Sequence, residues 1–226
     1  MPYIDQDKVD EKTREKLEAI IEKSYATFWR GKRLFDIFFA SLILLFFLPL
    51  MIIIAFVIVI DDPSAGPFYK QIRVGRHGKE FYMYKFRTMR ANADKMIDEL
   101  AKLNEMDGPV FKIKDDPRIT RVGKYLRKLS LDELMQFFNV FKGDMTLVGP
   151  RPPLPREVMY YTDYQRLRLL VTPGITCTWQ ISKNRNDIPF EQWVEMDIEY
   201  IQTRTYFNDI KIMLKTPVVM LTGTGR

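Results

Sequence analysis

One long apolar run dominates the hydrophobic pattern of the chain. It extends from Leu34 to Ile60 and is broken only by Asp36, Ser41 and Pro49. A helix of this length and composition can cross the hydrocarbon core of a bilayer. The run therefore predicts a membrane helix that either spans the bilayer or enters and leaves it on the same side.

Three features favour a re-entrant helix over a simple span. Pro49 lies near the middle of the run, where its ring and its missing N–H bend a helix. Asp36 is costly to bury in hydrocarbon, so we expect it at the membrane interface near Lys32 and Arg33. Basic residues flank both ends, and the positive-inside tendency keeps such flanks in the cytoplasm. These cations are Arg30, Lys32 and Arg33 before the run and Lys70, Arg73, Arg76 and Lys79 after it.

The membrane helix divides the chain into three parts. Residues 1–30 carry apolar side chains at helical spacing among many charges, which predicts an amphipathic helix at the membrane surface. A solvated helix packed on its own domain is the alternative. Residues 31–60 are expected to form the re-entrant helix bent at Pro49, and residues 61–226 a cytoplasmic domain that is long enough to be a catalytic domain with its own core. The apolar positions of the first part are Leu17, Ile20, Ile21, Tyr25 and Phe28.

The third part is predicted to be α+β and rich in helix. Two short strands, Phe68–Val74 and residues 79–86, are joined by a glycine-flanked turn into an antiparallel hairpin. His77 lies in this turn and is expected to be a turn residue rather than a ligand. A further strand is expected over 172–181. Helices are expected over 120–129, over 130–142, over 156–170 with cations facing solvent or lipid headgroups, and over 190–201 and 206–221 as amphipathic helices.

Residues 92–118 carry weaker signals. Helical spacing predicts a helix over 92–104, and a strand is expected over 108–113. The loop that follows contains Asp115 and Asp116 close to Arg118. Two adjacent carboxylates can hold a metal ion, although a solvated turn is the favoured interpretation of this loop.

Charge and composition narrow the chemistry. The 226 residues carry a net charge of +6, which suits an acidic partner such as nucleic acid, anionic lipid or a phosphorylated small molecule. The single cysteine, Cys177, excludes an intramolecular disulfide and a cysteine-based zinc cluster. The single histidine, His77, disfavours a Ser-His-Asp triad. Any catalysis therefore falls to carboxylates, lysines, arginines or a bound metal.

A cluster of cations begins at the end of the hairpin. Lys85, Arg87 and Arg90 alternate with apolar residues. Such interleaving can bind single-stranded nucleic acid, but the neighbouring membrane helix makes lipid phosphates the nearer acidic partner. We therefore expect membrane lipid, and no nucleic acid, among the partners.

The strongest candidate site lies in residues 127–153. Ser130 and Glu133 match the capping-box pattern, with Ser130 as the N-cap and Glu133 at the third helical position. Asp132 and Glu133 would then lie in the first turn, where the helix dipole favours ionised carboxylates. An ordinary helix start also explains this pattern. The expected buried stripe of the helix is Leu131, Leu134, Met135, Phe138 and Phe141, and Gly143 is expected to end it.

Two arginines extend this candidate site. Arg127 lies five residues before Asp132, and Arg151 is held between two prolines, so each can present a guanidinium to a phosphate oxygen. An ionised carboxylate can attack phosphorus when other groups neutralise the phosphate it approaches. An adjacent carboxylate such as Glu133 can hold a divalent cation through its oxygens. The residues thus indicate phosphate chemistry.

A series of motifs resembles the bacterial sugar transferases, the monotopic phosphoglycosyl transferases. The resemblance covers roughly residues 30–223. It is specific because several motifs match and occur along the chain in the same order as in the family. They are Arg33-Leu34-Phe35-Asp36, Gly66-Pro67-Phe68-Tyr69-Lys70-Gln71 with Arg73-Val74-Gly75, Lys85-Phe86-Arg87-Thr88-Met89, Arg127 with Ser130-Leu131-Asp132-Glu133-Leu134, Gln136 with Phe138-Asn139-Val140, Lys142-Gly143-Asp144-Met145, Val148-Gly149-Pro150-Arg151-Pro152, Pro173-Gly174-Ile175-Thr176 and Trp179-Gln180.

The resemblance implies a two-step phosphoryl transfer. Asp132 would attack the β-phosphorus of a UDP-sugar and release UMP, and a polyprenol phosphate such as undecaprenyl phosphate would then take the sugar phosphate from the enzyme. The product would be the first lipid-linked unit of a surface glycan, such as an exopolysaccharide, capsule, O-antigen or glycoprotein glycan. By the same resemblance Asp132 and Glu133 would act in catalysis, Glu133 with Asp132 would hold Mg²⁺, and Arg127, Arg151, Arg87 and Lys85 would bind phosphate.

The resemblance also bears on topology and on the sugar. A re-entrant helix bent at its proline is a family feature, which implies the bacterial inner (cytoplasmic) membrane with the catalytic domain on its cytoplasmic face. Leu48 stands where the family usually has the serine before this proline, so the bend is less well specified. Residues 182–187 resemble the motif of members that transfer hexose phosphates but contain one extra residue, which favours a hexose only slightly.

Two questions stay open at the level of sequence. The exposed apolar helices can face lipid or a second copy of the chain, so a homo-oligomer is compatible with the pattern. A noncatalytic membrane-anchored adaptor would use the same basic surface to bind anionic lipid or nucleic acid. Release of UMP from a UDP-sugar separates the enzyme from the adaptor.

Overall fold

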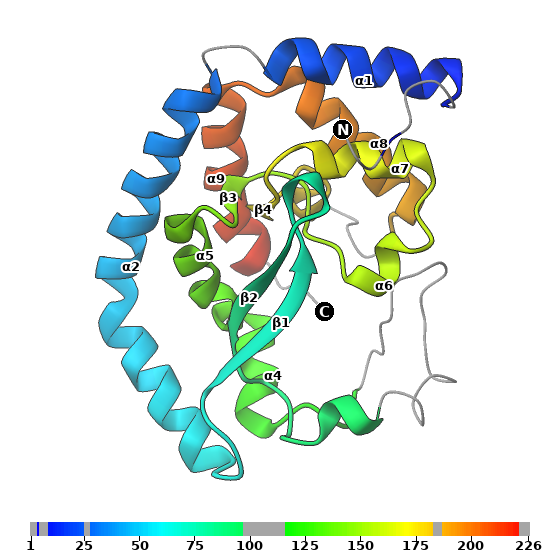
Figure 1. Cartoon of the computed structure of the whole chain (residues 1–226). Coiled ribbons are helices and arrows are strands. Elements are labelled where there is room, and N and C mark those ends of the chain that lie inside the picture. The colour runs from blue at the N-terminus through cyan, green and yellow to red at the C-terminus, as the bar shows by residue number, and fades with distance from the viewer. Residues whose placement is uncertain (1–3, 5–8, 25–27, 97–115, 183–186, 222–226) are drawn as a thin grey trace.

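Helices surround two small sheets in the computed structural model, which describes residues 4, 9–24, 28–96, 116–182 and 187–221 (Figure 1). The predicted helix-rich α+β class is confirmed. Residues 93–96 of the helix expected over 92–104 form one 3-10 turn; the rest of that helix and the strand expected over 108–113 lie outside the described residues. The α-helices are α1 (Glu11–Ser24), α2 (Phe28–Asp61), α4 (Arg121–Lys128), α5 (Gln136–Lys142), α6 (Pro155–Val158), α7 (Asp163–Arg166), α8 (Phe190–Thr203) and α9 (Tyr206–Leu221). The 3-10 helices are η1 (Arg76–Gly78), η2 (Ala93–Met96), η4 (Leu131–Met135), η5 (Leu167–Leu170) and η6 (Trp179–Ile181).

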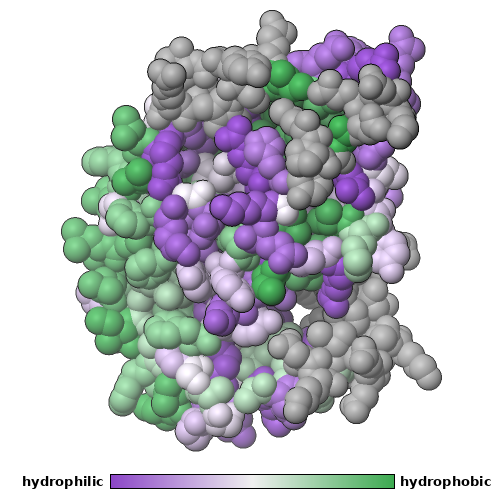
Figure 2. Space-filling view, viewed as in Figure 1, coloured by the Kyte–Doolittle hydropathy of each residue, from purple (hydrophilic) through white to green (hydrophobic). Residues whose placement is uncertain are grey.

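The apolar run forms the long helix α2. Figure 1 shows α2 as one continuous, gently curved helix along one side of the molecule, with Pro49 inside it. Its Gly31–Asp61 portion is the one helix within the described residues that is long and apolar enough to cross a membrane. One face packs on α4, α5 and β3, and the opposite face gives the apolar surface on the left of Figure 2. Its exposed side chains include Leu34, Phe38, Leu42, Leu45, Phe46, Ile52, Ile53, Phe56 and Ile60.

A buried polar network fastens the first part of α2 to the domain. The Lys32 ammonium lies 3.1 Å from a carboxylate oxygen of Asp36 and 2.8 Å from one of Asp209 on α9. The Thr146 hydroxyl donates to the other Asp36 oxygen at 2.6 Å. Asp36 is therefore buried against protein, with Lys32 as its partner, as its expected proximity to Lys32 requires. Its place at the membrane interface stays a prediction. Burial is tolerated because the charge is paired and hydrogen-bonded.

The last turn of α2 is fastened to the same domain. A carboxylate oxygen of Asp61 accepts a hydrogen bond from the Val122 backbone N–H at 3.1 Å, at the start of α4. The Arg87 guanidinium binds the Asp62 carboxylate and also donates to the carbonyls of Ala65 and Gly66 at 2.8 and 2.7 Å. Both ends of the apolar helix are thus attached to one body.

The predicted hairpin is confirmed almost residue for residue. Strands β1 (Phe68–Val74) and β2 (Glu80–Phe86) pair antiparallel, with Phe68 opposite Phe86. His77 turns the chain in the left-handed region, with φ of 57°, as a turn residue.

The sequence predicts only an antiparallel sheet, and the structure also contains a pair of parallel strands. Strands β3 (Thr146–Val148) and β4 (Gly174–Thr176) run parallel, joined by a crossover that contains α6, α7 and η5. The two chains approach so closely that a Cβ on Gly174 would lie 2.1 Å from the Gly149 nitrogen. The strand expected over 172–181 is shorter than predicted because the chain enters η6 after β4.

The main core lies between β3, η5 and α8. Val140, Leu147, Leu167 and Ile201 are among its fully enclosed side chains. Helix α1 contributes Leu17, so its apolar stripe contacts the domain, as the packed alternative for residues 1–30 requires. The other buried side chain of this stripe is Ile20.

The helix expected over 156–170 is broken into three short segments. Its Arg168, expected in solvent or at lipid headgroups, is instead buried beside the carboxylate of Asp197 on α8. The charge pair explains this burial, because a carboxylate partner offsets the cost of removing a guanidinium from water.

Candidate active site

The hairpin and η4 meet at an ion pair. The Lys85 ammonium, near the end of β2, donates to a carboxylate oxygen of Glu133 at 2.8 Å. Asp132 precedes Glu133 in η4 and is only 7% exposed. The structure therefore brings together three of the predicted site residues: two adjacent carboxylates and one lysine.

The predicted capping box is wrong. Ser130 adopts a left-handed conformation, with φ of 53°, and its side chain makes no capping hydrogen bond. Because α4 ends at Lys128 and η4 begins at Leu131, the chain must turn within two residues, and the first turn is 3-10 rather than α. The Glu133 side chain is bonded to Lys85 instead of to its own backbone. It is therefore free of the capping role and available to the site.

Asn139 fixes the position of the segment that carries the carboxylates relative to the hairpin. Its side-chain amide donates to the Tyr82 carbonyl at 2.7 Å, and its side-chain oxygen accepts from the Tyr84 backbone N–H at 2.9 Å. The residue is completely buried. These bonds join α5, which continues directly from η4, to β2, which carries Lys85. A one-residue slip of the hairpin would break them and separate Lys85 from Glu133.

The expected apolar stripe of this segment is partly wrong. Phe138 and Phe141 are exposed, whereas Gln136 and Asn139 are buried on α5. The shift follows from the 3-10 turn at the start, which changes the phase of the helix relative to a continuous α-helix.

Burial and nearby charges shift the pKa values of the two carboxyls in opposite directions. Burial, opposed by the charge of Lys85 and assisted by the neighbouring Glu133, raises the pKa of Asp132 to about 6. Burial alone would also raise the pKa of Glu133, but the charge and hydrogen bond of Lys85, with the charges of Arg151 and Arg73, lower it. Glu133 thus holds its negative charge more firmly than Asp132. The raised pKa leaves Asp132 largely ionised at neutral pH and more basic than an ordinary aspartate.

Arginines surround the carboxylates on two sides. The Arg127 guanidinium donates to the Thr88 hydroxyl at 2.9 Å. Its charge opposes the rise in the pKa of Asp132, but this effect is smaller than the effects of burial, Lys85 and Glu133. Arg151 is exposed, and its charge acts on Glu133. The positive surroundings suit an anionic ligand at the carboxylates.

Arg87 occupies a different environment from the other predicted phosphate ligands. Its guanidinium is buried in the turn after α2, where it donates to Asp62, Ala65 and Gly66. This geometry favours a role in anchoring that turn, and phosphate binding by Arg87 stays a prediction. The loop around Asp116 likewise forms an internal ion pair with Arg118 at 2.6 Å, as expected of a structural turn; Asp115 lies outside the described residues.

The donor set at the site is compatible with Mg²⁺. Within the described part of the chain, no cluster of three or more His, Cys, Asp or Glu side chains forms a metal cage. Mg²⁺ is commonly bound by one or two carboxylates together with substrate phosphates, so Asp132 and Glu133 fit an ion that arrives with a diphosphate. The lysine on Glu133 would share that carboxylate with the metal.

Two members of the site escaped the sequence reasoning. In the sequence, Arg73 is a flanking cation and part of the Arg73-Val74-Gly75 motif, and Asn139 is part of another motif, but neither is predicted to belong to the site. Strand alternation could have found Arg73, because Tyr69, Arg73 and Lys85 occupy one face of the hairpin. Nothing in the local pattern marks Asn139, whose two partners on the hairpin are more than 50 residues away in the chain.

Comparison with known proteins agrees with this geometry. The family model for the bacterial sugar transferase matches residues 27–223. The galactosyl transferase CpsE of Streptococcus agalactiae is 49% identical over 163 residues, covering 72% of this chain and 36% of that protein. The undecaprenyl-phosphate galactose phosphotransferase of Salmonella typhimurium is 44% identical over 201 residues, covering 86% of this chain and 41% of that protein.

The relatives differ in length. The chain spans about two fifths of the two proteins just named, but it covers 86% of the exopolysaccharide production protein ExoY of Rhizobium meliloti, to which it is 40% identical over 196 residues. The family match includes the hairpin, the carboxylate pair and the Arg151 segment. The chain belongs to the bacterial sugar transferase family.

Proposed function

We propose that the chain is a phosphoglycosyl transferase that moves a sugar-1-phosphate from a UDP-sugar to undecaprenyl phosphate or a related polyprenol phosphate. The observation that carries the proposal is Asp132, a buried carboxylate with a raised pKa among positive groups. Membership of the sugar transferase family and the substrate in the name of the Salmonella relative support it. A noncatalytic adaptor has no need of a buried carboxylate whose charge costs stability.

Asp132 is the nucleophile in the proposed mechanism. One of its carboxylate oxygens forms a bond to the β-phosphorus, and the bond from that phosphorus to the bridging oxygen breaks, so UMP leaves with the electron pair. The sugar phosphate is then covalently held on Asp132. A phosphate oxygen of the polyprenol phosphate attacks the same phosphorus, releases the Asp132 carboxylate and forms a polyprenol-diphosphate sugar.

The surrounding side chains have separate roles. Lys85 orients Glu133 and offsets negative charge at the reacting phosphate, and Arg127 and Arg151 bind phosphate oxygens. Asp132 and Glu133 would also hold Mg²⁺, which would offset the charge of the diphosphate when bound. Because Glu133 is held in the ionised form, we assign it to charge and metal binding rather than to nucleophilic attack.

The attachments of α2 support a re-entrant helix. A span would place the two ends of α2 on opposite sides of a hydrocarbon layer about 30 Å thick. Lys32 and Asp36 near one end and Asp61 and Asp62 at the other all contact the same polar domain. A helix that lies in one leaflet, with its exposed apolar face toward lipid, meets both requirements.

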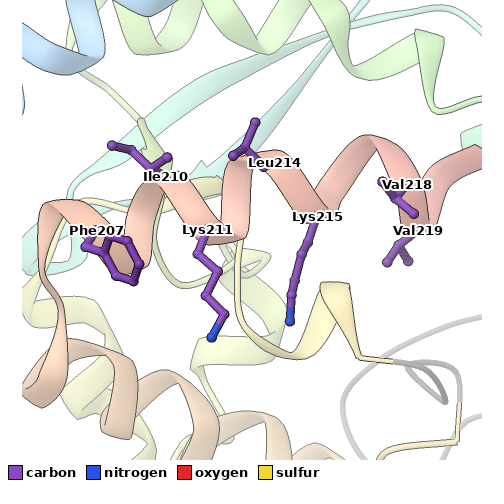
Figure 3. A pocket seen from close by; sticks show the side chains of 7 residues that line it. All are labelled: Phe207, Ile210, Lys211, Leu214, Lys215, Val218 and Val219. Carbon is purple, nitrogen blue, oxygen red and sulfur yellow. The ribbon is translucent and has the colours of Figure 1, made fainter.

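Helix α9 is a second candidate for contact with the membrane. A shallow groove along α9 is lined by Phe207, Ile210, Leu214 and other apolar residues. Figure 3 shows Ile210 and Leu214 on one side of the helix and the two lysines of the groove on the other. Apolar side chains can enter the interface while the lysines reach headgroups. The lysines are Lys211 and Lys215.

The proposed product begins a lipid-linked surface glycan. We place the enzyme in the bacterial inner membrane with its catalytic domain in the cytoplasm, where UDP-sugars are made. The names of relatives make UDP-galactose the first donor to test, consistent with a hexose. A panel of UDP-sugars in a UMP-release assay would identify the donor.

Substitution of the nucleophile tests the reaction. Asp132→Asn should lower release of UMP from UDP-galactose, in the presence of undecaprenyl phosphate and Mg²⁺, by at least about a thousandfold. The variant should unfold at a temperature no lower than the wild type, because at neutral pH it removes a buried charge. Asp163→Asn, which changes an exposed carboxylate on α7, is the matched control and should keep full activity. UMP release unchanged in Asp132→Asn would refute the assignment of the nucleophile.

The protonation of Asp132 predicts an acid limb in the pH profile. A protonated carboxyl cannot attack, so kcat/KM should fall as the pH drops through about 6. The Lys85 charge lowers the pKa of Asp132, so Lys85→Met should move the limb to higher pH as well as reduce the rate. Lys124→Met, on the exposed face of α4, should leave the limb in place. A limb that stays fixed in Lys85→Met would contradict this electrostatic account.

Cysteine labelling tests the topology. In a Cys177→Ser background, Asp5→Cys and Glu80→Cys introduce single thiols before and after α2. Both should resist a membrane-impermeant thiol reagent in intact cells and react after permeabilisation, because both flanks lie in the cytoplasm. Labelling of only one position in intact cells would show that α2 spans the membrane.

A further inference from the structure

Arg73 lies beside the candidate site without a carboxylate bonded to it. It is on the hairpin face that carries Lys85, since Tyr69 pairs with Lys85 and side chains alternate along a strand. The residue is only 6% exposed. Its guanidinium donates three hydrogen bonds to neutral oxygens, one to the Pro152 carbonyl at 2.9 Å and two to the Gln71 side chain at 3.1 and 2.7 Å.

These contacts position the segment that carries Arg151. The Arg73 side chain holds the Pro152 carbonyl, and the next residue, Val74, donates its backbone N–H to the Pro153 carbonyl at 2.9 Å. The Arg151 side chain is exposed and makes no hydrogen bond within the described residues. The place of its guanidinium therefore depends on the backbone on either side. β1 holds Pro152 and Pro153 after it, and the Gly174 backbone N–H donates to the Pro150 carbonyl before it at 2.9 Å.

The arrangement costs energy in the absence of an anion. Burial, and after it the charge of Arg151, lowers the pKa of Arg73 to about 10, so Arg73 is still charged at neutral pH. Glu157 and Glu133 offset part of this effect from a distance. A buried cation whose bonded partners are all neutral, close to a second cation, is unfavourable unless an anion joins them.

We propose that Arg73 is a positioning residue for the donor diphosphate, which fixes Arg151 through the Pro152 carbonyl and completes with it a two-arginine cradle. Three of the five guanidinium N–H groups are used by Gln71 and Pro152, and the other two have no partner among the described residues. A diphosphate is the anion that fits, since it offers oxygens to both arginines while its β-phosphorus faces Asp132. The inference rests on the proposed function.

Binding of UDP tests this role without turnover. UDP with Mg²⁺ is titrated calorimetrically into the purified, detergent-solubilised full chain. Arg73→Gln should raise the Kd of UDP at least about tenfold relative to the wild type. In the assay of UMP release, the same variant should raise the KM for the UDP-sugar by a similar factor with a smaller loss of kcat, because the contact is made before and during the reaction.

Arg204 provides a matched control. It is 2% exposed, and burial lowers its pKa to about 10 as well, but its charged neighbours are not residues of the site. Arg204→Gln should lower the unfolding temperature without changing the Kd of UDP. A purely structural role for Arg73 would give the same result in both variants.

A second variant keeps the test independent of folding. Gln71→Glu retains Arg73 and gives it a bonded carboxylate, so it should weaken UDP binding without lowering the unfolding temperature. If wild-type protein binds UDP and both Arg73→Gln and Gln71→Glu bind it equally well, the role of Arg73 is overturned while the proposed function stands. Wild-type protein that neither binds UDP nor releases UMP would overturn both.

Discussion

The ion pair between Lys85 and Glu133 is the contact on which the candidate site depends. It joins two segments that are 48 residues apart in the chain, and it accounts for the unequal affinity of the two carboxyls for protons. Because Lys85 helps to hold Glu133 in the ionised form, Asp132 is the carboxyl that takes up a proton first as the pH falls below neutral. Two adjacent acidic residues thereby differ in charge state, as the proposed division into a nucleophile and a charge-bearing neighbour requires.

The site is held in place by contacts that reach the membrane helix. Asn139 ties α5 to the hairpin, and α5 in turn packs on α2. The two ends of α2 are bound through Asp36 and Asp62 to the domain that carries Asp132. In the proposed orientation, the helix that enters the leaflet therefore also sets the height of the nucleophile above the lipid, where a polyprenol phosphate presents its headgroup.

Local patterns predicted the elements of the fold better than their contacts. The hairpin and the helices α8 and α9 follow from periodicity, since each buries one regular face. The capping box at Ser130 failed because the pattern cannot register a lysine on a distant strand that binds Glu133. The burial of Arg168 escaped prediction for the same reason, because only the fold brings Asp197 near it. Asp36 has its charge partner Lys32 one helical turn before it, but its burial depends on Thr146, which is 110 residues away.

The parallel pairing of β3 with β4 was also not predicted from the sequence. Parallel strands need a long crossover, and three-residue strands carry almost no alternation to reveal them. For the candidate site, residue chemistry and family motifs predicted Asp132, Glu133, Lys85, Arg127 and Arg151, and the structure places Asp132, Glu133 and Lys85 together. Strand alternation alone would place Arg73 beside Lys85, but its contact with the Pro152 carbonyl, like the contacts of Asn139 with the hairpin backbone, became visible only in three dimensions.

The central claim is that Asp132 carries the sugar phosphate between the two half-reactions. Its most direct test is mass spectrometry of the intact protein after incubation with the UDP-sugar that it uses and Mg²⁺, without the lipid acceptor. The account predicts a mass increase of one sugar phosphate, located on the peptide that contains Asp132 and lost when undecaprenyl phosphate is added. An active enzyme whose adduct lies on another residue, or which transfers the sugar phosphate without forming any adduct, would contradict it.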